Sequence, residues 1–362
     1  MRKKLSGLNI SVLFTGLILI ASGFQATGFS KGQLPKSVLN SPKEVTSTTY
    51  TNPVGNITHI GDPYVLQYGG KYYMYATSSK TGFIVRESSN LVDWEEKGLA
   101  LDKNSIGNKW GKGNFWAPEV KYIKGKFYMV YSALGNNGKM KIRIAVSKQP
   151  LGPFINLSPP LLDADAYSYI DGDMFIDGKQ VYLYFVKDCS LNILNGKHVS
   201  QVFVAALNDR LTGFTSEPKL ILSPDQQWEG IGSDWLWNEG PFVMKHAHRY
   251  YLFYSANSYA SPDYSVGVAT ADSPMGTWTK YQGNPILKKD PALRVSGPGH
   301  CMVTMSPDHS EWFIVYHTHS DFDHPSGDRN MCIDRLVFVN GIPKILGPTR
   351  TPQRLPEGAK KN

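Results

Sequence analysis

Three acidic motifs recur along the chain, and each precedes the same kind of segment. The motifs are Gly61-Asp62-Pro63, Ile170-Asp171-Gly172 and Glu239-Gly240-Pro241. Each is followed by a turn and an aromatic-rich stretch, at residues 71–75, 181–185 and 249–254. Because equivalent places in a repeated fold meet at one point in space, we expect Asp62, Asp171 and Glu239 to face one pocket. Three carboxylates in one pocket indicate acid/base chemistry. The alternative is that each acid only caps a turn.

Two carboxyl groups that flank a glycosidic bond can hydrolyse it, provided that one is protonated and the other ionised. We assign Glu239 as the general acid, because Glu has the longer reach and the aromatic segment 235–237 lies beside it. Asp62 is then the base that activates water, and Asp171 raises the pKa of the acid by like-charge repulsion. A separation of about 6.5–9.5 Å between acid and base would invert the anomeric centre. Three other acids are interpreted as turn or surface residues: Asp163, Asp173 and Asp177.

A repeat along the whole chain would position these acids. Two further segments share the template: Trp116-Ala117-Pro118-Glu119, followed by 126–131, and Gly297-Pro298-Gly299-His300, followed by 311–317. Five units at roughly 55–70 residue spacing are typical of a propeller, solenoid or array. Each unit contains four short segments rich in β-branched and aromatic residues, which indicate strands. The sequence therefore predicts an all-β fold, a five-bladed β-propeller with four antiparallel strands per blade. An array of independent β-sandwich domains is the alternative.

The composition agrees with one large β domain. The chain has 362 residues, of which such a domain can account for about 300. Aromatic residues make up 12%, as expected where Tyr and Trp fill the space between blades. The formal net charge is +8, and Arg2, Lys3 and Lys4 contribute to it. Because no Lys/Arg run alternates with aromatic residues, we expect no nucleic-acid partner. We expect a monomer that acts on carbohydrate.

The N-terminus has the features of a secretory signal peptide. A basic start at Arg2-Lys3-Lys4 precedes the mostly apolar stretch 8–21, which is short for a membrane span. We therefore expect a signal peptide over residues 1–26, a flexible leader over 27–50, the propeller over 51–350 and a C-terminal tail over 351–362. The protein would be secreted or periplasmic and free of the membrane after cleavage. The alternative is an uncleaved N-terminal anchor.

The three cysteines are Cys189, Cys301 and Cys332. Cys301 and Cys332 fall in the same final unit, where they either pair or remain buried free thiols. A disulfide-built scaffold would need more cysteines. No Cys-x-x-Cys or His-x-x-x-His cluster is present, which excludes a common zinc site.

The motifs, taken in order, strongly resemble those of glycoside hydrolase family 43 over nearly all of residues 55–350. They are Gly61-Asp62-Pro63, the segment 116–119, Asp171 with Phe175 four residues later, Glu239-Gly240-Pro241 and the segment 297–300. The resemblance implies a five-bladed propeller that inverts configuration on arabinose- or xylose-containing plant polysaccharides. It also implies the same roles for the acids: Asp62 as base, Asp171 as pKa modulator and Glu239 as acid. Gly172-Asp173 departs from the family pattern but leaves Asp171 in register.

The resemblance extends to two basic residues. His300 matches a histidine that faces the channel centre in many relatives, often near a bound calcium or sodium ion. It is therefore a candidate substrate and metal ligand, with Ca²⁺ as the candidate ion, and a purely structural histidine is the alternative. Arg329 resembles an arginine that reaches a substrate hydroxyl, and Arg335 competes for that assignment.

Aromatic residues provide candidate sugar contacts. The face of Trp116 can stack on the apolar face of a sugar ring, or the residue can pack between blades. Phe115, Trp235 and Trp237 are candidates for the pocket rim. We expect an exo-acting α-L-arabinofuranosidase or β-xylosidase, because the inserts 187–199 and 226–238 could close a groove. The alternatives are an endo-1,5-α-L-arabinanase and a non-catalytic carbohydrate-binding propeller.

Overall fold

The computed structural model describes residues 48–157, 159–163 and 166–359. The signal peptide expected over residues 1–26, and nearly all of the leader expected over 27–50, lie outside these residues. Within the described part, no helix has the length and apolar character required to cross a membrane. The expected catalytic domain, residues 51–350, is described apart from positions 158, 164 and 165.

The described residues form seven β-sheets, five of which have four antiparallel strands. Sheet 1 contains β2 (Gly61–Tyr68), β3 (Lys71–Thr77), β4 (Gly82–Ser88) and β5 (Glu95–Asp102). Sheet 2 contains β6 (Gly113–Ile123), β7 (Lys126–Leu134), β8 (Met140–Ser147) and β9 (Ile155–Asn156). Sheet 3 contains β10 (Tyr169–Asp177), β11 (Gln180–Lys187), β14 (Gln201–Ala206) and β15 (Lys219–Leu222). Sheet 4 contains β17 (Asn238–His246), β18 (Arg249–Ala256), β19 (Ser265–Ala271) and β20 (Thr279–Lys280). Sheet 5 contains β21 (Gly299–Met305), β22 (Trp312–His319), β23 (Arg329–Val339) and β24 (Ile342–Ile345).

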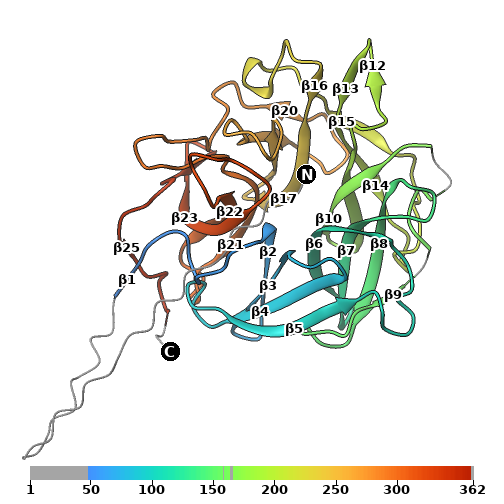
Figure 1. The fold of residues 1–362 in the computed structure, drawn as a ribbon, viewed down its shortest axis with the longest axis horizontal. Coiled ribbons are helices and arrows are strands. Elements are labelled where there is room, and N and C mark those ends of the chain that lie inside the picture. Colours follow the sequence, from blue (N-terminus) through green and yellow to red (C-terminus); the bar gives the residue numbers. More distant parts are fainter. Residues whose placement is uncertain (1–47, 158, 164–165, 360–362) are drawn as a thin grey trace, which may run out of the picture. The chain divides into compact units, whose positions relative to one another are not determined.

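The five sheets close a ring. Their first strands β2, β6, β10, β17 and β21 contact one another in this order, and β21 contacts β2 (Figure 1). This is the architecture of a β-propeller, in which the first strand of each sheet faces the axis. The prediction of an all-β fold built from four-stranded antiparallel sheets is confirmed.

The aromatic second strands fill the space between neighbouring sheets. Tyr75 of β3, Tyr184 of β11 and Tyr254 of β18 are fully buried. The Tyr75 hydroxyl donates to the carbonyl of Pro150 at 2.5 Å, and that of Tyr184 donates to Pro274 at 2.8 Å. A buried tyrosine requires such a partner for its hydroxyl. These bonds therefore join each of two second strands to the loop between the third and fourth strands of the next sheet in the ring.

Each innermost strand carries a β-bulge at the same place. The register against the second strand shifts between residues 61 and 64, 116 and 119, 170 and 173, 239 and 242, and 299 and 302. The second residue of every bulge has a positive φ, as follows: Asp62 55°, Ala117 43°, Asp171 54°, Gly240 56° and His300 47°. Bulges of this kind re-aim side chains and are frequent beside active sites. The shared bulge is the structural unit behind the repeated sequence motif.

A chain of hydrogen bonds links the bulges around the ring. In four sheets, a residue of the second strand that pairs with the first residue of the bulge has a side-chain acceptor. This side chain accepts a hydrogen bond from the N–H of the positive-φ bulge residue in the next sheet. The pairs are Ala117 to Thr77, Asp171 to Ser132, His300 to Ser255 and Asp62 to His317. The equivalent residue of sheet 3 is Val186, whose side chain has no acceptor. The N–H of Gly240 donates to the carboxylate of Asp171 instead, at 3.0 Å. The exception therefore links Asp171 to Gly240, the residue that directly follows Glu239.

Two smaller sheets lie outside the ring of five. β1 (Thr49–Tyr50) pairs with β25 (Gln353–Arg354), so the ends of the expected leader and tail form a two-stranded sheet. β12 (Ile193–Leu194), β13 (Lys197–Val199) and β16 (Trp235–Leu236) form the other. A 3₁₀ turn, Gln227–Glu229, precedes β16.

The cysteines are unpaired in the described structure. Cys189, Cys301 and Cys332 are buried free thiols. Of the two alternatives for Cys301 and Cys332, the structure therefore shows the free thiols. Arg350 donates to the Cys332 sulfur at 3.2 Å, which occupies that thiol with a partner other than Cys301.

Candidate active site

The structure brings the three predicted catalytic acids into one cavity. Asp62, Asp171 and Glu239 line a cavity of about 430 Å³ at the bulges of the innermost strands. The acids come from sheets 1, 3 and 4 and are separated by at least 68 residues in sequence. Asp188, from the insert after β11, adds a fourth carboxylate to the lining. The cavity therefore has four carboxyl groups in its lining, together with His300 and Arg329.

Glu239 does not occupy the repeat position of the two aspartates. Asp62 and Asp171 are the second, positive-φ residues of their bulges, whereas Gly240 is the second residue in sheet 4. Glu239 stands one residue earlier, at the position of Gly61 in sheet 1. The expectation of three equivalent positions is therefore wrong for Glu239. The bulge lets adjacent residues of one strand both line the cavity, where a regular strand would send them to opposite faces.

The carboxylate of Asp62 lies among positive charges. Its Oδ1 accepts from Arg329 Nη1 at 2.7 Å and lies 3.3 Å from His300 Nδ1. Its Oδ2 accepts from the Thr77 hydroxyl at 2.6 Å. Burial alone would raise the pKa of this carboxyl, but Arg329, His300 and the hydrogen bonds outweigh it and hold the pKa well below the usual range. Asp62 is therefore ionised at any ordinary pH.

The Arg329–Asp62 ion pair requires a glycine before the base. A Cβ atom at residue 61 would lie 1.9 Å from Arg329 Nη2. Gly61 therefore leaves the space in which the guanidinium reaches the carboxylate, a contact between residues 267 positions apart. Arg335, the competing candidate, instead donates to Glu311 at 2.9 Å and lies away from the cavity lining.

Asp171 and Glu239 have pKa values that move in the opposite direction. Burial, with a contribution from the charge of Asp62, raises the pKa of Asp171 to about 6, although His300 and the Gly240 N–H oppose the rise. Burial raises the pKa of Glu239 well above its usual value, and the neighbouring Asp171 carboxylate adds to this rise. Glu239 is therefore the protonated member of the group near neutral pH.

Two buried aromatic side chains beside the acids, Tyr264 at Glu239 and His317 at Asp62, were not predicted from the sequence. The Tyr264 hydroxyl donates to Glu239 Oε1 at 2.9 Å, and its ring stacks on His317 at a centroid distance of 5.5 Å. A Cβ at residue 299 would lie 2.2 Å from the Tyr264 ring, so Gly299 makes room for it. Burial lowers the pKa of His317 well below its usual value, and its Nδ1 accepts the Asp62 N–H. No local pattern around Tyr264 or His317 distinguishes them from core residues.

The predicted aromatic contacts have different environments. Trp116 and Trp237 line the cavity, and the Trp116 side chain is partly exposed. Phe115 is buried and packs against Phe83 and Tyr131, and it also lines the smaller cavity described below. Trp235 stacks on Trp237 at 6.1 Å, outside the cavity lining.

The surroundings of His300 do not match the needs of calcium. Calcium takes six to eight oxygen ligands. Among the described residues, no group of three or more His, Cys, Asp or Glu side chains is placed to hold a metal ion. The nearest carboxylate to His300, that of Asp62, is already bonded to Arg329 and Thr77. The calcium ion therefore stays a prediction of the sequence, and no step of the chemistry below depends on it.

Asp173 is not the turn or surface acid that the sequence suggested. It is fully buried in β10, 2.9 Å from Lys121 Nζ, and accepts the Val243 N–H at 2.7 Å. Lys121 also lies 3.9 Å from Glu119. Burial and the charge of Asp173 raise the pKa of Glu119 well above its usual value. The Gly172-Asp173 pair resembles a turn in sequence but belongs to a bulge that continues into an innermost strand.

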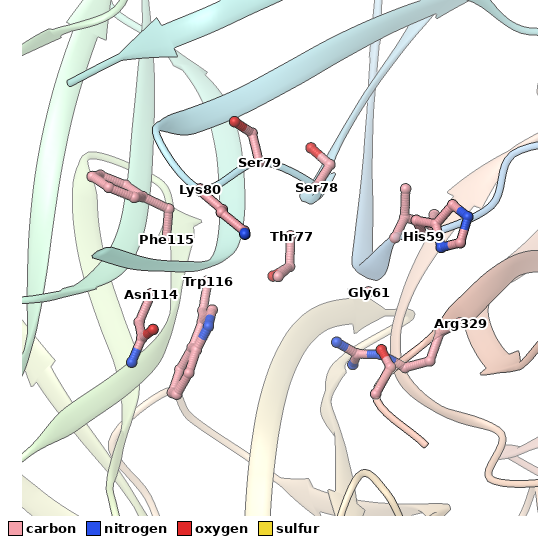
Figure 2. Close-up of a pocket in the computed structure, with 12 residues that line it drawn as sticks. His59, Gly61, Thr77, Ser78, Ser79, Lys80, Asn114, Phe115, Trp116 and Arg329 are labelled. Carbon is pink, nitrogen blue, oxygen red and sulfur yellow. The ribbon is translucent and has the colours of Figure 1, made fainter. Parts of the chain in front are cut away.

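A second, smaller cavity of about 280 Å³ adjoins the first (Figure 2). The two share part of their lining: Asn114, Trp116, Gly327 and Arg329. Further residues of the smaller cavity come from β3 and the turn that follows it: Thr77, Ser78, Ser79 and Lys80. Trp116 thus lines both the cavity that contains the carboxyl groups and one without a carboxylate in its lining.

Comparison with known proteins points to one family. A sequence profile described as "Glycosyl hydrolases family 43" matches residues 50–343. The chain is similar to Alpha-L-arabinofuranosidase 43 of Humicola insolens, with 29% identity over 87% of this chain and 68% of that protein. It is also similar to an Extracellular exo-alpha-(1->5)-L-arabinofuranosidase of Streptomyces avermitilis, with 27% identity over 75% of this chain and 56% of that protein.

A solved structure is considerably more similar. The crystal structure of a thermostable family-43 glycoside hydrolase superposes with a TM-score of 0.84 and 56% sequence identity. The match covers 86% of this chain and all of that chain.

Proposed function

Because the chain belongs to glycosyl hydrolases family 43 and is a glycoside hydrolase, we propose that it is an inverting, exo-acting α-L-arabinofuranosidase or β-xylosidase. Its substrates are arabinose- or xylose-containing plant polysaccharides or oligosaccharides. The observation that carries this proposal is the opposite movement of two pKa values in one cavity, with Asp62 ionised and Glu239 protonated. Such a pair supplies the base and the acid of a glycosidase.

In the proposed reaction, Glu239 transfers its proton to the glycosidic oxygen as the bond from that oxygen to the anomeric carbon breaks. Asp62 accepts a proton from a water molecule, whose oxygen forms the new bond to the anomeric carbon from the opposite face. The Tyr264 hydroxyl, 2.9 Å from Glu239 Oε1, stabilises the carboxylate that remains. Arg329 holds Asp62 in place at 2.7 Å. Burial keeps Glu239 protonated, and like-charge repulsion from Asp171 adds to this effect.

The stereochemical outcome tests this assignment of roles. Proton NMR of the first-formed sugar should show the anomer opposite to that of the substrate, because water attacks directly from the Asp62 side. A first product with retained configuration would require a covalent intermediate on a carboxylate and would exclude Asp62 as a general base.

Exo action is supported by the two inserts beside the cavity. β13, in the first insert, pairs in parallel with β16, in the second, so the inserts support each other. Asp188 and Ser190 from the first insert and Trp237 from the second line the cavity. A wall on this side favours a pocket that admits a chain end.

Product lengths distinguish exo from endo action. With linear arabinan, arabinoxylan and xylan as substrates, an exo enzyme should release only the monosaccharide from the start of the reaction. Early oligosaccharide products would instead favour the endo-1,5-α-L-arabinanase alternative. Parallel assays with nitrophenyl arabinofuranoside and nitrophenyl xylopyranoside identify the preferred sugar.

Secretion is also part of the proposal. The basic and apolar N-terminal segment supports it, and the similar Streptomyces avermitilis protein is described as extracellular. The protein recovered from the culture medium or the periplasm should begin near residue 27. Recovery of the full-length chain in the membrane fraction would favour an uncleaved anchor.

A further inference from the structure

The smaller cavity shown in Figure 2 has no part in the hydrolysis steps above. It shares Trp116 with the carboxyl cavity and reaches Arg329, the partner of the proposed base (Figure 2). Its volume of about 280 Å³ approaches the range of small-ligand sites. One sugar unit adjacent to the cleaved bond could therefore occupy it.

The lining of this cavity carries positive charge without a carboxylate. In Figure 2 the amino group of Lys80 and the guanidinium of Arg329 point into the same space from different sides. Lys80 has no ion pair or hydrogen bond with another residue in the described part of the chain. Arg329 uses Nε for the Gly327 carbonyl and Nη1 for Asp62. Among the described residues, its Nη2 has no hydrogen-bond acceptor.

The nearby acids and hydroxyl groups are already occupied. Asp62 is bonded to Arg329 and Thr77, and Asp328, which is not in the lining, lies 3.0 Å from His59. The Ser78 hydroxyl donates to the Ala76 carbonyl. The groups available to a ligand therefore include the Lys80 amino group, Arg329 Nη2, the Asn114 amide and the Trp116 ring.

The linings of the two cavities differ in charge, although Arg329 belongs to both. Carboxyl groups of Asp62, Asp171, Asp188 and Glu239 line the larger one. An anionic sugar unit would be repelled there and attracted to the smaller cavity. Charge thus orients a substrate that carries one acidic unit, with its neutral unit at the catalytic acids.

We propose that the smaller cavity binds the carboxylate of a uronic acid unit next to the pentose that is released. The carboxylate bonds to Lys80 and to Arg329 Nη2, and Trp116 contacts the sugar ring. This inference rests on the proposed function, because it assigns the unit beside the cleaved bond.

Calorimetric titration of the complete protein with two matched pairs of ligands tests the inference. The pairs are D-glucuronic acid with its methyl ester and D-galacturonic acid with its methyl ester, which differ in charge but hardly in shape. At low ionic strength the free acid should bind about tenfold more tightly than the ester, and added salt should reduce this ratio. The two pairs distinguish which configuration at C4 the cavity accepts.

Two lysine variants locate the effect. Lys80→Gln should lower the acid-to-ester affinity ratio to about threefold or less, because one of two cations is removed. Lys344→Gln removes the same charge from an exposed position on the outer strand β24 and should leave the ratio unchanged. Equal binding of acid and ester by the unaltered protein, or equal effects of both substitutions, would overturn the inference.

Hydrolysis by the same preparations separates this inference from the proposed function. If no nitrophenyl pentoside is cleaved while the acids bind selectively, the proposed function fails and the anion site stands. If pentosides are cleaved while acid and ester bind equally, only the uronic acid site fails.

Discussion

At the scale of single residues, Asp62 and Glu239 share one cavity, yet their pKa values move in opposite directions. Burial raises both, but Asp62 has Arg329 at 2.7 Å and His300 at 3.3 Å, whereas Glu239 has Asp171 as its charged neighbour. The neighbours therefore decide which carboxyl group is the acid and which the base.

Replacing the proposed acid tests its role directly. Glu239→Gln keeps the size of the side chain but cannot donate the proton, so kcat should fall by about 10²–10⁴-fold on substrates with poor leaving groups. Steady-state kinetics measures this loss. Glu217→Gln, at an exposed glutamate, is the matched control and should retain full activity. Comparable activity of both variants, with oligosaccharide still bound, would favour the non-catalytic alternative.

The raised pKa of Asp171 predicts a pH-dependent stability effect. Its folded pKa of about 6 lies above the usual value of 3.8, so its contribution to stability is present at low pH and is lost as pH rises through 6. Above pH 7, Asp171→Asn should therefore increase the free energy of unfolding by at most about 3 kcal/mol and raise the melting temperature, whereas below pH 4 it should give no gain. Thermal unfolding at both pH values measures this.

Activity should change in the opposite sense in the same variant. Asp171→Asn removes a negative charge beside Glu239, so the pKa of the acid should fall and the alkaline limb of the pH–rate profile should move to lower pH. An unchanged profile, together with unchanged stability at high pH, would show that Asp171 is not the modulator.

At the scale of strands, the site is positioned by the bulges and by the hydrogen bond that the backbone N–H of each bulge donates. Thr77, Ser132, Ser255 and His317 each accept the bulge N–H of the next sheet. Val186 breaks this pattern, and its missing acceptor leaves the Gly240 N–H for Asp171. An apolar residue thus determines a hydrogen bond between two functional motifs.

Val186→Thr tests this relation. The new hydroxyl should compete for the Gly240 N–H, weaken its bond to Asp171 and raise the pKa of Asp171 further. The expected readout is a shift in the pH–rate profile of at least a few tenths of a unit. Val202→Thr, at the fully buried partner of Val186 on β14, is the control for introducing a hydroxyl into this core. Equal shifts in both variants would indicate a packing effect only.

A buried ion pair holds the second insert next to the acid. Lys280 Nζ donates to Glu229 at 2.7 and 2.8 Å and to Asn238 Oδ1 at 2.9 Å, and Asn238 directly precedes Glu239. Glu229 is fully buried and also accepts from Tyr254 at 2.8 Å. The network therefore connects the 3₁₀ turn to the first residue of β17.

Lys280→Met should destabilise the protein by about 3–5 kcal/mol, because it leaves the Glu229 carboxylate buried without its cation. Urea unfolding measures the loss. The double variant Lys280→Met, Glu229→Gln should recover part of this stability, since it removes the unpaired charge. A single variant as stable as the unaltered protein would contradict the assigned role of the pair.

At the scale of the whole described domain, segments near both ends of the described residues contact each other and sheet 5. β1 pairs with β25, and Asn52 accepts the Ile333 N–H at 2.9 Å and donates to the Ile333 carbonyl at 2.8 Å. Arg354 joins Arg335 in binding Glu311. Segments at the two ends therefore both bind to sheet 5.

Removal of residues 351–362 should lower the melting temperature by several degrees, because β25 and the Arg354–Glu311 contact are lost. The KM should not change, since these residues do not line the cavity. Removal of residues 360–362 alone is the control. A truncated chain that melts at the original temperature would show that β1 and β25 contribute little to closure.

The sequence by itself determined the strand pattern, the five repeated motifs and the acids that meet. These are local properties, because β-branched and aromatic alternation and turn residues act over a few neighbouring positions. The buried Asp173 was misinterpreted for the same reason. Its Gly172-Asp173 pair resembles a turn locally, and only the contact with Lys121 reveals an inward strand position.

Only the tertiary structure decided the chemistry of each acid. The one-residue offset of Glu239 follows from the bulge register, and the charge state of Asp62 follows from Arg329, 267 residues away. Tyr264, Val186 and Lys80 likewise gain their significance from neighbours in other parts of the chain. Desolvation and charge interactions depend on distance in space, which a repeat in sequence does not specify.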